Sequence, residues 1–406
     1  MFKKIAFFNL FFLILTLNCF SGEADDPLSV YLTWTMSPET TMSIQWISKN
    51  SEMDNSVYYK PFNICDEKEQ TPFFHKLATY EKMPDGHPFL IHQVELTDLL
   101  PGVIYVFKIS ENGQLYKFKT IPKELTELKF VEGGDIYRNG IDIVEETNRQ
   151  AAAQNPMFAV IGGDIAYSAD PSNAFFPEDA YRWLRFFKAW TNTMVTKEGF
   201  LIPIIPVIGN HETRGGYGQT PAEAAFFYAF FPMPGKKGYN VLDFGNYMSL
   251  ILLDSGHTHP ISGQQTEWLE KTLKARSAVP YKFAVYHVPA YPSIRNFSNA
   301  VSLALRKNWV PHFDTYSLKV AFEHHDHTYK RTYPLKNGRK HEKGVIYIGD
   351  GAWGIAKPRP PARLIPYVEK SAQSRNFILV TLNELCVTYE AINPNGEIID
   401  RVIQKK

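Results

Sequence analysis

Cysteine is scarce in this sequence of 406 residues, which contains only Cys19, Cys65 and Cys386 and no CxxC pair. Zinc fingers and thioredoxin-like redox sites need such pairs, so the sequence supports neither of them. A bound metal would have to be held by oxygen and nitrogen atoms. We expect no structural disulfide, because Cys65 and Cys386 fall in different predicted domains and a chain of this length can bury large hydrophobic cores without one.

An excess of charge of one sign is also absent. The sequence has 43 lysine and arginine residues against 42 aspartate and glutamate residues, and its formal net charge is +1. This balance gives no general electrostatic reason for binding nucleic acid or a membrane surface. We therefore expect no nucleic-acid partner, and the sequence leaves the oligomeric state open.

Residues 1–22 read as an export signal. Two lysines precede an apolar segment from Ile5 to Leu17, which is too short to span a membrane comfortably. Two outcomes stay open: cleavage after Ser21, or lipid attachment at Cys19 through a relaxed lipobox. Both predict an exported protein, whether periplasmic, at the cell surface or secreted. A buried core helix is disfavoured because the segment is terminal and the polar stretch GEADDP follows it.

The remainder divides into two predicted domains, at residues 27–121 and 125–406. The first contains short alternating segments that predict a small β-sandwich: SVYLTW, MSIQWIS, NSVYYK, HQVELTDL, VIYVFKIS and QLYKFKT. The second alternates apolar strands with helical stretches, namely DIVEETNRQAAAQ, PEDAYRWLRFFKAWTNTMV and GQQTEWLEKTLKAR. This alternation is typical of a layered α/β domain.

Five polar motifs in the second domain each follow a run that reads as a buried strand. Their candidate ligands are Asp135 in GGDIY, Asp164 and Tyr167 in GGDIAY, Asn210 in GNHE, His287 in AVYH, and His325 and His327 in EHHDH. Because ligands bind at the carboxyl edge of open α/β sheets, we expect the motifs to meet there. Burying an ionised aspartate that has no basic partner in sequence costs free energy. A bound cation is therefore the favoured explanation for the aspartates in these motifs.

Each motif taken alone has a simpler reading. A GD or NH pair is more often a turn signal, His287 more often a hydrogen-bonded core histidine, and Tyr167 more often a packing residue. Their conjunction is what favours a metal site. Oxygen, imidazole and phenolate donors suit a hard or borderline cation.

The order GD, GDxxY, GNHE, xxxH and HxH resembles the purple acid phosphatase branch of the metallophosphoesterases, from about Ser29 to the end of the chain. The stretch LTDLLPGVIYVFKI resembles the fibronectin type III-like module of that family. The resemblance implies an α/β fold in which an N-terminal all-β sandwich is followed by a metallophosphoesterase-type two-sheet β-sandwich flanked by helices. The second domain would be calcineurin-like and catalytic.

The resemblance also implies a site. Fe(III) would be held by Asp135, Tyr167 and His327, Asp164 would bridge, and Asn210, His287 and His325 would hold a divalent Fe, Zn or Mn ion. His211 would protonate the leaving group or stabilise charge in the transition state; its alternative role is to orient its neighbours.

The implied activity is that of an exported acid phosphatase, in which a metal-bound hydroxide attacks a small phosphate monoester in line. Two alternatives stay open. One is a phosphodiesterase or nucleotide hydrolase of the same superfamily, and the other is a non-catalytic exported binding protein.

The sequence departs from the family pattern at Tyr137 and His324, where glycine is usual, and at Ala284, where valine is usual. We expect the Tyr137 ring to border the metals. The loop after His287 lacks the histidines of plant-like members, and Arg295 is a candidate to replace them in binding phosphate.

Two further segments have open roles. His257 and His259 in DSGHTHP are candidates for substrate binding, although a turn is the favoured reading. The stretch KPRPPARLIP predicts a surface loop, with a basic rim facing the substrate as the second reading.

Overall fold

The computed structural model describes residues 27–49, 54–62, 71–362 and 364–406. The predicted export signal, Cys19 and Cys65 lie outside these residues. Within the described ranges, no helix combines the length and the apolar character needed to cross a membrane.

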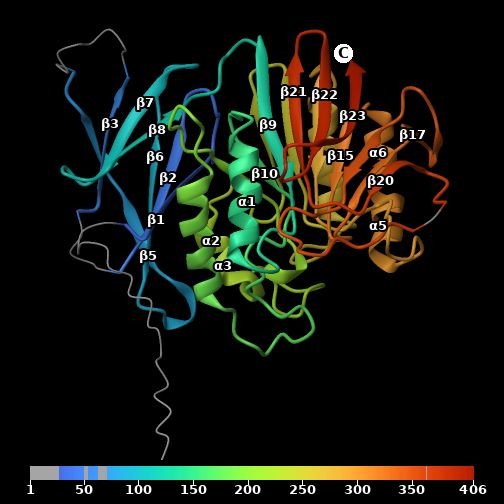
Figure 1. Cartoon of the computed structure of the whole chain (residues 1–406), viewed down its shortest axis with the longest axis horizontal. Helices are drawn as coiled ribbons and strands as arrows, with labels where there is room; N and C mark the ends of the chain where they lie inside the picture. Colours follow the sequence, from blue (N-terminus) through green and yellow to red (C-terminus); the bar gives the residue numbers. More distant parts are fainter. Residues whose placement is uncertain (1–26, 50–53, 63–70, 363) are drawn as a thin grey trace, which may run out of the picture.

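The N-terminal domain is a sandwich of two four-stranded antiparallel sheets (Figure 1). One sheet contains, in spatial order, β1 (Ser29–Thr33), β2 (Met42–Ser48), β6 (Leu90–Leu96) and β5 (Thr79–Lys82). The other contains β4 (Phe74–Leu77), β3 (Ser56–Pro61), β7 (Ile104–Ile109) and β8 (Leu115–Lys119). Strands β4 and β5 were not predicted, because their side chains are mostly exposed and show no apolar alternation.

Strand β1 lies where the two domains contact each other, and it is buried on both faces. Val30 and Leu32 pack in the sandwich core, whereas Tyr31 packs against helix α2 (Ala180–Thr193), with its ring centroid 4.1 Å from that of Phe187. The Thr33 hydroxyl donates a hydrogen bond to a backbone carbonyl of the second domain at 2.7 Å. The sandwich therefore packs directly against the second domain.

The second domain contains two larger sheets. The six-stranded sheet has the order β11 (Ile204–Pro206), β10 (Ala159–Ile161), β9 (Glu127–Gly133), β21 (Phe377–Asn383), β22 (Cys386–Ile392) and β23 (Ile398–Lys405). The seven-stranded sheet has the order β12 (Asn240–Phe244), β13 (Met248–Leu252), β14 (Tyr281–Val285), β15 (Val320–Glu323), β19 (Ile346–Gly349), β16 (Tyr329–Thr332) and β20 (Val368–Ala372). A small hairpin joins β17 (Leu335–Lys336) to β18 (Arg339–Lys340).

The two large sheets pack face to face, with an aromatic core between them. Phe130 of β9 and Phe158, which directly precedes β10, stack at 4.9 Å, and Phe130 contacts Phe283 and Phe322 of the other sheet. Burying such large rings supplies much of the hydrophobic stabilisation of a domain. The sheets are thereby fixed relative to one another.

Helices cover the outer faces of both sheets (Figure 1). Helices α1 (Ile141–Ala152), α2 and α3 (Ala225–Phe230) share a hydrophobic cluster with the six-stranded sheet. Helices α4 (Gln264–Ala275), α5 (Ala300–Asn308) and α6 (Val310–Thr315) share another with the seven-stranded sheet. This architecture confirms the predicted fold class.

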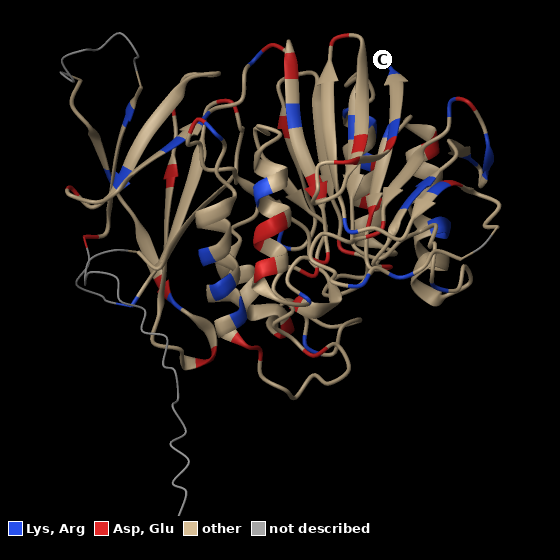
Figure 2. Ribbon diagram, in the orientation of Figure 1, with Lys and Arg blue, Asp and Glu red and all other residues tan. Residues whose placement is uncertain are grey.

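Acidic and basic residues are mixed through the structure, in keeping with the small net charge. Figure 2 shows acidic residues along α1 next to basic residues along the neighbouring α2. The buried side chains of the two helices are mostly apolar instead, including Val144 of α1 and Trp183 of α2. Both helices therefore have the amphipathic pattern expected of helices covering a sheet.

Candidate metal centre

The five motifs converge because their strands run in the same direction. Strands β9, β10 and β11 are parallel, and so are β13, β14, β15 and β19. Each motif begins at or just after the carboxyl end of its strand, so the two sheets bring the motifs to one edge. The predicted meeting of the polar motifs is found there.

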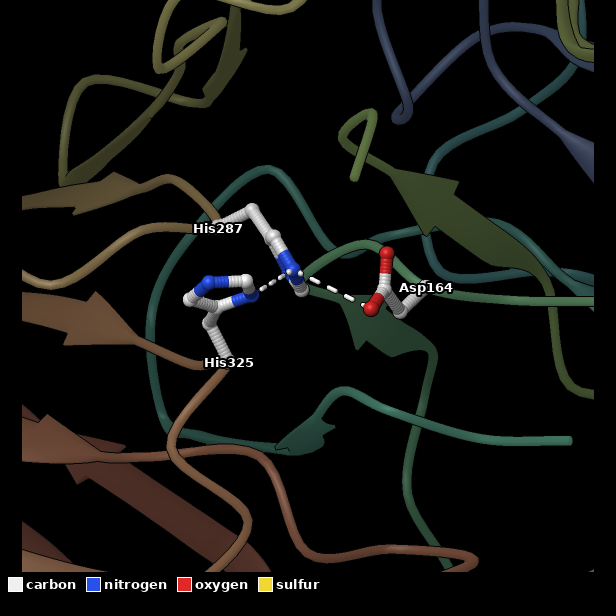
Figure 3. A group of neighbouring side chains, drawn as sticks. All are labelled: Asp164, His287 and His325. Atoms are coloured by element: carbon white, nitrogen blue, oxygen red, sulfur yellow. Dashed lines mark hydrogen bonds and ion pairs between the residues drawn. The ribbon is translucent and has the colours of Figure 1, made fainter. Parts of the chain in front are cut away.

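Two groups of buried donors lie at this edge: Asp164, His287 and His325, and Asp135, Asp164 and His327. Within each group, one donor atom from each residue lies within 4.8 Å of the others. Asp164 belongs to both groups. This is the arrangement of two neighbouring cation sites that share a carboxylate. Figure 3 shows the first group, with His287 between His325 and Asp164.

In the first group, Nε2 of His287 is the central atom. It lies 3.3 Å from Oδ2 of Asp164, 3.0 Å from Nδ1 of His325 and 3.1 Å from Oδ1 of Asn210. The other ring nitrogen of His287 lies 2.9 Å from the carbonyl oxygen of Gly162, which can only accept a hydrogen bond. Nδ1 therefore carries a hydrogen, and Nε2 faces the other donors, as in metal-binding histidines.

In the second group, Nε2 of His327 lies 2.7 Å from Oδ1 of Asp135. The hydroxyl of Tyr167 donates to the same oxygen at 2.9 Å and lies 3.2 Å from Nε2 of His327. Burial and the charges of Asp135 and Asp164 raise the pKa of Tyr167 well above its usual value. A trivalent cation at this point would oppose both effects and favour the phenolate.

The residues present fit two metal ions. Oδ2 of Asp164 is buried, and its neighbour is Nε2 of His287 at 3.3 Å, so when that nitrogen carries no proton the carboxylate oxygen needs a metal cation beside it. Burial raises the pKa of Asp164, but His287 and His211 outweigh burial and hold that pKa well below its usual range. An ionised, shared carboxylate surrounded by imidazole and phenol groups suits hard or borderline metals.

The backbone is strained at the same residues. Positive φ angles occur at Asp135 (57°), Asp164 (53°), Tyr167 (52°), His325 (76°) and His327 (62°). Residues other than glycine rarely adopt this conformation, and it costs free energy when they do. Five of the seven candidate ligands share it, so the fold is constrained to aim their side chains at one place.

Glu212 of the GNHE motif organises two of the metal-site loops, a role that we did not predict. Its carboxylate accepts hydrogen bonds from the backbone N–H groups of Asp164 at 2.7 Å, Ile165 at 2.6 Å and Gly209 at 3.0 Å. Burial and the charge of Asp164 raise the pKa of Glu212 to about 8, whereas three N–H donors favour its ionised form.

Tyr217 is a second contributor that we did not predict. Its hydroxyl lies 3.2 Å from Nε2 of His325, the ring nitrogen that does not face His287. Its ring lies over His257, with the centroids 4.9 Å apart. Tyr217 comes from the glycine-rich loop after GNHE, where nothing in the sequence distinguishes it.

The structure places His211 beside Asp164, the carboxylate shared by the two donor groups. Its backbone N–H donates to Oδ1 of Asp164 at 2.8 Å, and its ring lies 4.2 Å from that of Tyr167. Nδ1 of His211 lies 3.3 Å from the carbonyl oxygen of Ala169. The imidazole is partly exposed, so a substrate can reach it.

The two histidines of DSGHTHP, His257 and His259, lie in different surroundings. His257 is buried, with its ring 5.7 Å from that of His287, and its Nδ1 lies 2.8 Å from the carbonyl oxygen of Gly216. His259 lies instead beside Asp254, with 3.5 Å between Nδ1 and Oδ2. Asp254 accepts hydrogen bonds from several backbone N–H groups of this segment, which forms the turn favoured by the sequence.

Arg295 is close to the centre but engaged. Its guanidinium donates to the carbonyl oxygen of His325 at 2.5 Å and to Oδ1 of Asp326 at 2.7 Å. It therefore braces the segment that contains His325 and His327. To bind phosphate, the Arg295 guanidinium would have to donate to the phosphate and to these two acceptors at the same time.

Packing accounts for the surroundings of two of the three departures from the family pattern, Tyr137 and His324. Tyr137 is buried in the hydrophobic cluster beneath α1 and α2, and the Arg182 guanidinium covers its ring at 4.2 Å; that this ring also borders the metals stays a prediction. His324 is buried against Gly134 and Gly162, and its Nε2 forms a hydrogen bond with Glu132. His324 thus packs against the two loops that contain Asp135 and Asp164.

Two models of known families match this chain. Residues 27–120 match the model described as purple acid phosphatase, N-terminal domain, and residues 128–329 match the model described as calcineurin-like phosphoesterase. Fold and site thus define a calcineurin-like phosphoesterase. With the N-terminal match in the same chain, the protein belongs to the purple acid phosphatase family.

Similar proteins bear related names. Purple acid phosphatase 13 of Arabidopsis thaliana is 22% identical over 351 residues, which cover 74% of this chain and 62% of the relative. Acid phosphatase type 7 of Homo sapiens is 22% identical over 425 residues, covering 93% of this chain and 88% of the relative. The purple acid phosphatase from yellow lupin (Lupinus luteus) seeds has a similar fold, with a TM-score of 0.75, 17% identity, and coverage of 93% of this chain and 74% of that one. This chain spans less than two thirds of the length of the first curated relatives that it matches.

Proposed function

We propose that the protein is an exported, metal-dependent phosphomonoesterase. The observation that carries this proposal is the sharing of Asp164 between two groups of metal-binding donors. Asp135, Tyr167 and His327 would hold Fe(III), and Asn210, His287 and His325 would hold a divalent Fe, Zn or Mn ion. Two adjacent metals would supply a nucleophile at acidic pH and neutralise charge on the transferred phosphoryl group.

The residues of the chain prepare this chemistry in three ways. Glu212 holds the loops of Asp164 and Asn210 together through backbone hydrogen bonds. Tyr217 contacts His325 and fixes the ring that presents Nδ1 to His287. Such fixed positioning reduces reorganisation during the reaction.

His211 is the candidate for proton transfer to the leaving group. It is partly exposed beside Asp164, whereas His257 is buried and His259 lies in the turn held by Asp254. In this position a protonated His211 imidazole could donate its proton to a departing alkoxide. His211→Gln would then slow p-nitrophenyl phosphate less than an alkyl ester, whose leaving group needs the proton more.

Steady-state hydrolysis tests the proposed function. The metal-loaded protein is assayed with p-nitrophenyl phosphate and with bis(p-nitrophenyl) phosphate across acidic and neutral pH. A higher kcat/KM for the monoester supports the proposal. Preference for the diester would replace it by a phosphodiesterase, and no hydrolysis of either by protein containing two metals would favour a binding protein. Export is tested separately, by fractionating cells that express the full chain.

A further inference from the structure

The loops that contain Asp135 and Asp164 run side by side as they leave the six-stranded sheet. Past the paired residues of β9 and β10, three successive backbone N–H groups of one loop donate to three successive carbonyl oxygens of the other. The donors are Asp135, Ile136 and Tyr137, and the acceptors are Gly163, Asp164 and Ile165, at 3.0, 2.8 and 2.9 Å. Backbone hydrogen bonds therefore hold the two loops together up to Tyr137 and Ile165.

A side chain from helix α2 continues this pairing. Nε of Arg182, in the first turn of the helix, donates to the carbonyl oxygen of Ala166 at 2.6 Å, and Nη2 donates to that of Tyr137. One guanidinium thus bridges a carbonyl oxygen from each loop. Its planar group presents several donors in a fixed arrangement, which the ammonium group of a lysine does not. Burial lowers the pKa of Arg182, yet an arginine side chain stays charged because its ordinary pKa is so high.

The guanidinium is itself held in place. It covers the ring of Tyr137, with 4.2 Å between its central carbon and the ring centroid, and this contact adds a cation–π attraction. At the backbone, the N–H of Arg182 donates to the carbonyl oxygen of Asp179 at 3.1 Å. Asp179 is the N-cap residue of α2, and its carboxylate accepts a hydrogen bond from the N–H of Tyr181 at 3.0 Å. The helix cap and the aromatic ring together fix where the guanidinium lies.

The bridged carbonyl group of Ala166 lies between two candidate metal ligands in the sequence. Asp164 comes just before Ala166 and Tyr167 directly after it, and both have positive φ angles, of 53° and 52°. Such a conformation persists only where the surrounding structure enforces it. The turn brings the Tyr167 hydroxyl to 2.9 Å from Oδ1 of Asp135. Arg182 ties this turn to the loop that contains Asp135.

Building on the proposed function, in which Tyr167 binds a metal, we propose that Arg182 is a positioning residue for Tyr167. It acts through the backbone of both loops and sets the distance between the Tyr167 oxygen and the Asp135 carboxylate. The metal-free protein therefore already presents these two ligands close together, and less reorganisation accompanies metal binding. Loss of the bridge lets the turn relax and moves the phenol away from the carboxylate.

The first test measures amide hydrogen exchange in metal-free protein, so it depends on neither metal nor activity. Arg182→Lys keeps the charge but cannot bridge both carbonyl oxygens. We expect the segments 133–138 and 163–167 to exchange about tenfold faster or more in this variant, because hydrogen bonds from a charged group are lost. Arg185→Lys, at an exposed position of the same helix, is the matched control and should leave exchange unchanged. Equal exchange in Arg182→Lys and the parent would contradict the proposal.

The second test asks whether Arg182 acts through Tyr167. The affinity of the metal-free protein for Zn²⁺, measured by competition with a chelator, should fall about tenfold or more in Arg182→Lys. Tyr167→Phe removes the candidate ligand itself. If Arg182 acts by placing that ligand, Tyr167→Phe/Arg182→Lys should bind Zn²⁺ no more weakly than Tyr167→Phe. Additive losses would show that Arg182 supports the site in general, and they would overturn the proposal.

Hydrolysis assays separate this role of Arg182 from the proposed function. If Arg182→Lys matches Arg185→Lys in both hydrogen exchange and Zn²⁺ affinity, Arg182 has no positioning role, even when the parent hydrolyses p-nitrophenyl phosphate. If exchange becomes faster while Zn²⁺ affinity is unchanged, Arg182 only stabilises the loops and the proposal is again wrong. If the parent hydrolyses nothing, yet Arg182→Lys loses loop protection and Zn²⁺ affinity as expected, the positioning role stands and the proposed function fails.

Discussion

Nε2 of His287 and Nδ1 of His325 face each other at 3.0 Å, both in fully buried surroundings. Burial lowers the pKa of both rings, but Asp164 outweighs burial at His287 and raises its pKa to about 9, whereas the pKa of His325 stays well below its usual value. Together the two rings present one positive charge to Asp164. A divalent cation can take the place of that proton, with both imidazoles neutral.

Asp164→Asn tests the shared carboxylate. The substitution keeps the shape of the side chain but removes the charge that both donor groups share. We expect the metal content to fall and kcat for p-nitrophenyl phosphate to drop by about three orders of magnitude or more. Asp142→Asn, at an exposed carboxylate in the first turn of α1, is the matched control and should change neither. Full activity in the Asp164 variant would exclude the shared-carboxylate mechanism.

Tyr217→Phe tests the hydrogen bond to His325. Removing the hydroxyl frees the ring to rotate and lowers its basicity, and loss of such partners typically weakens metal binding about 10- to 100-fold. Competition with a chelator measures the affinity for the more weakly held metal. Tyr181→Phe is the control, since Tyr181 is an exposed aromatic residue of α2. Equal affinities in the two variants would show that Tyr217 has no positioning role.

Gly162→Ala tests the packing of His324 beneath the metal centre. A Cβ atom at position 162 would overlap the His324 ring, so we expect the free energy of unfolding to fall by about 1 to 3 kcal/mol. Adding His324→Ala removes the overlap, and the double variant should lose less stability than the sum of the two single variants. Denaturant unfolding of the four proteins measures this coupling, and strictly additive losses would contradict the packing.

Glu178 makes the free energy of unfolding depend on pH below neutrality. Burial raises its pKa to about 7, and the hydrogen bond from the Ser168 hydroxyl, 2.9 Å from Oε2, offsets this only in part. Between pH 4.5, the ordinary pKa of a glutamate, and about pH 7, the folded protein keeps a proton on Glu178 that the unfolded chain has lost. The contribution of Glu178 to the free energy of unfolding therefore falls as the pH rises.

Glu178→Gln has no proton to lose, so it should be more stable than the parent above pH 7, by up to about 3 kcal/mol, with the difference vanishing below pH 4.5. Chemical denaturation at several pH values measures the difference. Glu198→Gln, at an exposed position, should show no such trend. A stability difference that does not change with pH would contradict the raised pKa.

The strand ends could be predicted because each candidate ligand follows a strongly apolar run, and parallel strands bring such ends to one edge. Buried strands such as β9 and β14 are easily recognised in this way, whereas the exposed edge strands β4 and β5 have no apolar pattern to detect. The fold class therefore followed from the sequence, and the edges of the N-terminal sandwich did not.

The supporting residues of the site could not be predicted in the same way. Glu212 and Tyr217 act through single hydrogen bonds whose partners are far away in sequence. The environments of Tyr137 and His324 are set by the residues that they contact. Tyr137 contacts Arg182, and His324 contacts the glycines of the metal-site loops. Local pattern gives the position of a residue in its element, but not its partner across the core.

The visible spectrum of the purified protein, recorded together with its metal content, shows whether Tyr167 and Asp135 hold a ferric ion in a two-metal site. We expect two metal ions per chain and a phenolate-to-iron absorption band that disappears in Tyr167→Phe while the protein remains folded. A colourless protein that contains two divalent metals, or a band that survives in Tyr167→Phe, would contradict it.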